Sequence, residues 1–151
     1  MKRYLEFNYD IEKKYKLFNK LYFEDFLPNN IPVYFLSNKR VTGGGAYPNE
    51  DYSDLEKIEL TDMSDFLVDS VLEDVYDSML IHEMVHGYLF KKFGRDLKHN
   101  AHGKEFKYKL FEIVKKGDFK FIDSRQVTKL EVPIEYWIKS NKNKQKDNLI
   151  G

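Results

Sequence analysis

Two histidines and a glutamate near the middle of the chain have a spacing that can bind a metal and activate water. In the segment LIHEMVHGYLF, His82 and His86 are four residues apart, so a helix would project both imidazoles from one face. Glu83 adjoins the first histidine. Zinc accepts neutral imidazole nitrogens, and in catalytic sites it holds a water whose pKa it lowers to about 7. The H-E-x-x-H pattern therefore predicts a metal-bound water that attacks a carbonyl group, with Glu83 accepting its proton.

A zinc site of this kind needs a third protein ligand, and the residues leave its identity open. The metzincin spacing requires glycine three residues and histidine six residues after the second histidine. Leu89 and Lys92 occupy these positions and exclude that class. The candidates farther along the chain are His99, His102, Glu105 and Glu112. The alternative is a pair of core histidines that are only hydrogen-bonded, which the adjoining glutamate and the two further histidines disfavour.

Hydrophobic spacing predicts the helices that would position these residues. Apolar residues recur at three- and four-residue steps over residues 11–26, a first helix that Asn8 or Asp10 would cap and Pro28 would end. The central histidines lie in a second helical pattern, residues 65–93, as one helix or two pieces, with Ser64 as its N-cap and Gly94 as its terminating residue. This helix is apolar on nearly all sides of its middle, so it should be buried.

A third helix and a small sheet complete the predicted fold. The third helix should begin near His102 and end before Gly117. Short strands are predicted in IPVYFLSN and KIELTD, with VTGGGAYPN between them as a flexible or bulged extended segment. These patterns predict an α+β fold in which a small, mostly antiparallel sheet packs on the central H-E-x-x-H helix, with two further helices.

Composition bounds the class of protein. The chain has 151 residues, of which 42% are hydrophobic, and no cysteine, which excludes disulfides and thiolate metal ligands. It has no apolar segment of signal-peptide type at its start and no run of transmembrane length. We therefore expect a soluble, cytoplasmic monomer that does not bind membranes. Residues 1–138 are assigned to one domain and residues 139–151 to a polar, flexible tail.

The formal net charge of zero hides an uneven distribution. Residues 46–77 contain eleven acids and one base, whereas residues 91–146 contain sixteen bases and seven acids. The basic half could contact a phosphate backbone without reading its sequence, and the alternative is a pair of solvated faces that balance one another. The candidate nucleic-acid contacts are Lys139, Lys142, Lys144 and Lys146.

The two histidine motifs together resemble those of the SprT-like family of zinc metalloproteases, which includes the Spartan proteases. HEMVH is followed by HGKEF, where the family has H-E-x-x-H and then H-G-P-x-F. Upstream, FNKLYFEDFLP resembles the family's N-x-x-x-F-x-x-x-L pattern through Asn19, Phe23 and Leu27. The resemblance extends over about residues 17–106. Lys104 replaces the family's usual proline, and the cysteine zinc ribbon of many relatives has no counterpart here.

The resemblance implies a zincin-like metalloprotease core with one Zn²⁺ per chain. It assigns His82, His86 and His102 as ligands and Glu83 as the catalytic base, and it assigns no role to His99. The implied reaction is hydrolysis of peptide bonds in proteins associated with DNA, and single-stranded DNA is the favoured nucleic-acid partner. The alternatives are a regulatory protease that cuts one protein partner and a non-catalytic, zinc-stapled binding module. The presence of Glu83 argues against the non-catalytic module, because a structural zinc site needs ligands but no base.

The glycine-rich segment is the predicted place for the protein substrate. In zincins an edge strand above the metal helix pairs with extended substrate, a form of strand addition. The corresponding residues here are Gly43, Gly44, Gly45, Ala46 and Tyr47. The alternative is a loop or bulge in which glycine only supplies unusual backbone angles.

Overall fold

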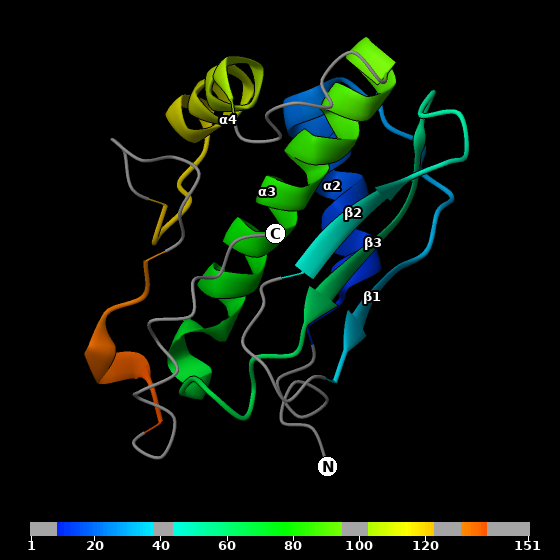
Figure 1. Ribbon diagram of the computed structural model, residues 1–151. Coiled ribbons are helices and arrows are strands. Elements are labelled where there is room, and N and C mark those ends of the chain that lie inside the picture. Colours follow the sequence, from blue (N-terminus) through cyan, green and yellow to red (C-terminus); the bar gives the residue numbers. More distant parts are fainter. Residues whose placement is uncertain (1–8, 38–43, 95–102, 123–130, 139–151) are drawn as a thin grey trace.

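The central element of the fold is the long helix α3, Leu72–Phe93. A computed structural model of the chain describes residues 9–37, 44–94, 103–122 and 131–138. The three-stranded sheet packs on one side of α3 and α4 packs on another, while α2 lies behind α3 beside the sheet (Figure 1). The other elements are α2 (Ile11–Phe23), β1 (Val33–Leu36), β2 (Gly44–Pro48), β3 (Leu55–Thr61), α4 (Lys104–Lys116) and the short 3₁₀ turns η1 (Asp69–Val71) and η3 (Ile134–Tyr136). The predicted α+β class is confirmed.

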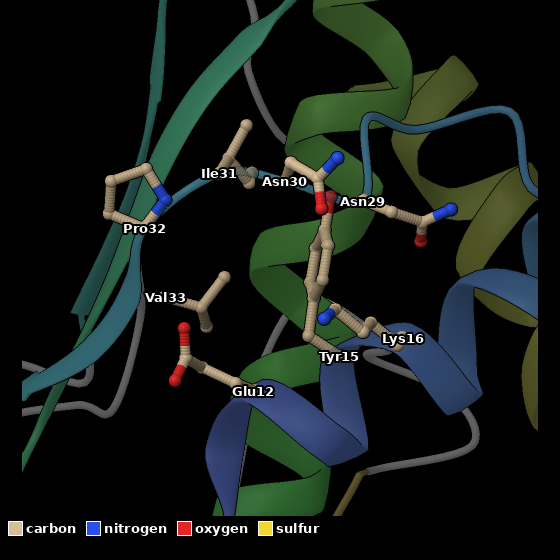
Figure 2. A pocket seen from close by; sticks show the side chains of 8 residues that line it. All are labelled: Glu12, Tyr15, Lys16, Asn29, Asn30, Ile31, Pro32 and Val33. Carbon is tan, nitrogen blue, oxygen red and sulfur yellow. The ribbon is translucent and has the colours of Figure 1, made fainter.

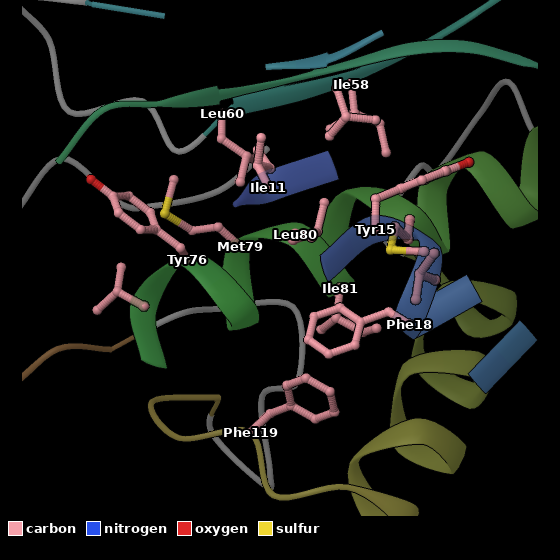
Figure 3. Close-up of a cluster of buried hydrophobic side chains, with 14 of the residues drawn as sticks. Ile11, Tyr15, Phe18, Ile58, Leu60, Tyr76, Met79, Leu80, Ile81 and Phe119 are labelled. Carbon is pink, nitrogen blue, oxygen red and sulfur yellow. The ribbon is translucent and has the colours of Figure 1, made fainter. Parts of the chain in front are cut away.

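The hydrophobic core lies where the sheet and α2 meet α3. Ile58 and Leu60 of β3 point from the sheet towards α3, and both are fully buried (Figure 3). On the side of α3 away from the sheet, the Phe18 ring of α2 contacts the Phe119 ring edge-on, with 5.6 Å between centroids. The middle of α3 is therefore enclosed by apolar side chains, as its composition predicted.

The sheet is mixed, where the sequence predicted a mostly antiparallel one. Its strand order is β1-β3-β2. β2 and β3 pair antiparallel across a short turn, and β1 pairs parallel with β3 on the other edge. Alternating hydrophobicity shows which side chains are buried but not the direction of a neighbouring strand, so only the three-dimensional path distinguishes these pairings.

The helix α3 begins later than its pattern predicts, and the predicted cap at Ser64 is wrong. The Ser64 hydroxyl is buried with no hydrogen-bond partner, and the N-cap position belongs to Val71. Residues 66–68 instead pair with residues 136–138: the Val68 amide donates to the Tyr136 carbonyl and the Ile138 amide to the Phe66 carbonyl, each at 2.9 Å. This long-range pairing overrides the local helical pattern. At the other end, Gly94 terminates α3 as predicted.

The helix α2 also departs from its predicted end. The Asp10 carboxylate caps its start, as predicted, by accepting from the Lys13 amide at 3.1 Å. The helix ends at Phe23 and not at Pro28, because Glu24 adopts a left-handed conformation. The amides of Glu24 and Asp25 both donate to the Asn19 carbonyl, which closes the last turn.

The buried side chain of Asn19 holds the turn that follows α2. Its Nδ2 donates to the Leu27 carbonyl at 2.8 Å, and its Oδ1 accepts from the Leu27 amide at 3.1 Å. Nδ2 also donates to Asn29 Oδ1 at 2.9 Å. The asparagine and the leucine of the upstream pattern are therefore direct partners.

Replacing Asn19 by alanine should lower the free energy of unfolding by about 3 kcal/mol, because it leaves the buried amide and carbonyl of Leu27 without partners. Urea unfolding of both proteins would measure the difference. The matched control is Asn30→Ala in the same turn, where the side chain is exposed and the expected change is within about 0.5 kcal/mol. Equal losses in the two variants would show that Asn19 does not hold the turn.

A pocket of about 390 Å³ lies between α2 and the residues that lead into β1 (Figure 2). Its lining residues are Glu12, Tyr15, Lys16, Asn29, Asn30, Ile31, Pro32 and Val33. None of them belongs to the predicted site. Among the helices that the structure describes, none is long and apolar enough to cross a membrane.

Candidate metal centre

The side chains of His82, Glu83 and His86 are all buried in the middle of α3. The two imidazole rings lie one helical turn apart, with 5.1 Å between their centroids. Gly87 follows immediately and allows β3 to approach the helix, because a Cβ there would lie 2.6 Å from Leu55 Cδ2. The sequence thus brings two nitrogen donors and one carboxylate together within two turns of a helix that the fold encloses.

The buried carboxyl group of Glu83 lacks a hydrogen-bond partner at one of its oxygens. It is 2% exposed, and its Oε1 atom has no hydrogen-bond partner. Burial alone raises the pKa of Glu83 to about 8, and a cation held by the neighbouring imidazoles would lower it and favour the ionised form that can act as a base. Buried polar atoms are normally satisfied, so this unpaired oxygen, on the helix that carries both imidazoles, makes Glu83 a candidate functional group. This donor set fits a divalent metal with nitrogen ligands and an adjacent base.

The first turns of α4 border the two imidazoles. The Phe106 ring is fully buried and lies against both, with its centroid 4.8 Å from that of His82 and 4.6 Å from that of His86. Gly103, which caps α4, is also buried. The sequence contained Phe106 in its second motif but assigned it no role, because contact between an aromatic ring and imidazoles twenty residues away has no local signal.

The structure does not bring a third ligand to the pair within the residues it describes. No group of three histidine, cysteine, aspartate or glutamate side chains able to hold a metal occurs in these ranges. Glu105 is exposed, and Glu112 is exposed and forms an ion pair with Lys109 at 3.3 Å. His99 and His102 lie outside the described residues, so the assignment of His102 stays a prediction.

The predicted substrate segment forms the edge strand β2. Residues 44–47 pair with β3, and in the described part of the chain no other strand joins β2 (Figure 1). Gly44 has a φ of 141°, and a Cβ there would lie 2.3 Å from the Glu59 carbonyl oxygen, so only glycine fits. β2 also packs along α3. Gly43 lies outside the described residues.

Tyr47 of β2 is an exposed aromatic side chain on this edge strand. Its ring folds back over Gly45, where a Cβ would lie 2.7 Å from the hydroxyl oxygen. Partial burial and a hydrogen bond with Glu59 raise the pKa of Tyr47, and the Glu83 carboxylate contributes in the same direction. The predicted nucleic-acid contacts at Lys139, Lys142, Lys144 and Lys146 lie outside the described residues.

A protein-family model matches most of the chain. The model of the SprT-like family matches residues 11–128, which covers α2, the sheet, α3 and α4. No curated protein and no solved structure matches the chain. Because the family match extends over most of the sequence and includes both histidine motifs, the chain belongs to the SprT-like family.

Proposed function

We propose that this protein is a zinc-dependent endopeptidase with a zincin-like core. The observation that carries the proposal is the buried cluster on α3, where two imidazoles adjoin a carboxylate whose Oε1 has no partner. A helix that served packing alone would gain stability from apolar residues at these three positions. Membership of the SprT-like family supports the same chemistry.

His82, His86 and His102 would hold one Zn²⁺. The first two supply adjacent nitrogens on α3. His102 directly precedes Gly103, the cap of α4, and α4 is held against both imidazoles by Phe106. The adjacency of His102 to Gly103 in the sequence is therefore what supports it as the third ligand. When bound, zinc supplies a Lewis acid that polarises the peptide carbonyl and lowers the pKa of water.

Glu83 would serve as the base in this reaction. Its orphaned Oε1 accepts a proton from the attacking water, and the carboxyl group then delivers a proton to the departing amine. Apolar side chains around the site keep bulk water out, which strengthens electrostatic interactions within it. The edge strand β2 would bind the substrate as an added strand through backbone hydrogen bonds.

The target proteins are a further part of the proposal. Kinship with the family favours proteins associated with DNA, and a single dedicated protein partner is the second candidate. A zinc-stapled module without catalysis is disfavoured by Glu83, because a purely structural site needs ligands but no base.

Purified protein should contain about one zinc per chain, and removal of the metal by a chelator should abolish cleavage of an unfolded protein substrate. Elemental analysis and a gel-based cleavage assay, run with and without single-stranded DNA, would measure both. Chelator that is already saturated with zinc is the control and should leave cleavage unchanged. Full activity in metal-free protein would contradict the proposal.

A further inference from the structure

The sheet has one face towards α3 and one face away from it, which we call the outer face. Ile58 and Leu60 of β3 point towards α3 and are fully buried (Figure 3). Side chains alternate along a strand, so Lys57 and Glu59 lie on the outer face. Tyr47 of β2 is paired with Lys57, and residues that are paired directly across two strands share a face. Tyr47, which is 42% exposed, therefore has its ring on the outer face of the edge strand.

Glu59 joins the Tyr47 ring to the rest of the sheet. Its carboxylate accepts a hydrogen bond from the Tyr34 hydroxyl of β1 at 2.5 Å, and it lies 3.5 Å from Lys57 Nζ. The hydrogen bonds from Tyr34 and Tyr47, together with the charge of Lys57, lower the pKa of Glu59 despite its partial burial. Lys57 Nζ in turn lies 5.0 Å from the centroid of the Tyr47 ring. Side chains from all three strands thus fix the position of this ring.

The Tyr47 ring covers two alternate positions of the edge strand. A Cβ at Gly45 would lie 2.7 Å from the Tyr47 hydroxyl oxygen and 2.9 Å from Cζ, so the ring lies against the Gly45 backbone. Lys57 and Glu59 contact the ring from β3, which lies on the side of β2 away from its free edge. The side of the ring towards the free edge is therefore the side available to a strand added there.

We propose that Tyr47 is a specificity-determining residue, which selects an aromatic or β-branched side chain at the substrate position opposite to it. The role rests on the proposed function, in which the substrate is added as a strand beside β2. Every second side chain of such a strand lies on the outer face, where the residue directly opposite Tyr47 has its Cβ about 4.5–5.5 Å away. Aromatic and β-branched side chains gain most from this contact with a ring.

The contacts of the ring indicate that shape and apolar area decide this preference, and not charge. Lys57 and Glu59 form an ion pair with each other. The hydroxyl groups of Tyr34 and Tyr47 are both bonded to Glu59. A charged substrate side chain at this position would thus meet no unpaired opposite charge among these four residues.

Cleavage of a peptide library of random sequence by the full chain tests the proposal. Mass spectrometry of the products gives the residues preferred at each position around the cleaved bond. The variants are Tyr47→Ala, Tyr47→Phe and the matched control Tyr108→Ala. Tyr108 is 66% exposed on α4 and also has a lysine against its ring, with 5.8 Å between Lys104 Nζ and the ring centroid. Thermal unfolding checks that each variant folds like the parent.

For the parent, one position should be enriched in aromatic and β-branched residues. A peptide with such a residue should be cleaved with a kcat/KM about fivefold above that of its alanine counterpart, the upper end of what one cross-strand pair contributes. Tyr47→Ala should reduce this ratio to about 1. Tyr47→Phe keeps the ring and should retain most of the ratio, and Tyr108→Ala should give the parental value.

The ratio of the two kcat/KM values separates recognition from a structural role. A role of Tyr47 confined to the stability of the sheet would lower kcat/KM equally for both peptides, so an unchanged ratio in Tyr47→Ala would overturn the proposal. Cleavage by the parent without any preferred position would overturn it as well, and the proposed protease would stand. A parent that cleaves no peptide would contradict the protease and, with it, this role of Tyr47.

Discussion

Replacing Glu83 by glutamine should lower the rate of peptide-bond hydrolysis about a thousandfold while zinc stays bound, within the range that a positioned acid–base group contributes. The substitution keeps the shape of the side chain and leaves His82 and His86 in place. It removes only the ability of the buried Oε1 to accept a proton. The variant therefore tests the role of the base independently of the metal ligands. A hydrolase would lose activity and keep zinc, whereas a zinc-stapled module would have no activity to lose.

The measurement pairs steady-state cleavage of an unfolded protein with elemental analysis of the same sample. The matched control is Glu73→Gln in the first turn of the same helix, where the carboxylate is exposed and forms an ion pair with Lys14 at 3.1 Å. This variant should cleave at the parental rate. If Glu83→Gln also cleaves at that rate, Glu83 is not the base and the proposed mechanism is wrong.

Replacing His102 by alanine should weaken zinc binding by at least about 100-fold, because the loss of even an outer-shell partner of a zinc ligand costs 10–100-fold. His99→Ala and Glu105→Ala should bind zinc like the parent. Glu105 is exposed in the first turn of α4, only three residues from His102, so it is the stringent control. Competition with a chromophoric chelator measures the affinity of all three variants, independently of catalysis.

The opposite order of zinc affinities in the His102→Ala and Glu105→Ala variants would also identify the ligand. If Glu105→Ala loses zinc and His102→Ala keeps it, α4 supplies a carboxylate ligand and the histidine assignment carried over from the family pattern is wrong. If neither variant loses zinc, the third ligand lies elsewhere. The contact of Phe106 with both imidazoles, which supports the expectation of a ligand at the start of α4, would then have only a packing role.

Local features of the sequence were sufficient to predict three helices, though not every end of them, and to place His82, Glu83 and His86 together on one helix. Apolar spacing located α2, α3 and α4, and glycines marked the ends of α3 at Gly94 and of α4 at Gly117. The four-residue spacing of His82 and His86 places them on one face of any helix that contains them. These features depend on residues that are close together in the sequence, so they can be predicted from the sequence alone.

Only the tertiary structure decided the features that depend on contacts between distant segments. α3 begins at Leu72 because residues 66–68 pair with residues 136–138, about seventy positions along the chain. The parallel pairing of β1 with β3 and the contact of Phe106 with the imidazoles arise in the same way. The exposure of Tyr108 and Phe111 likewise depends on which side of α4 meets α3. A local pattern shows that a side chain is apolar, but the packing of remote elements determines whether it is buried in the core or displayed to a partner.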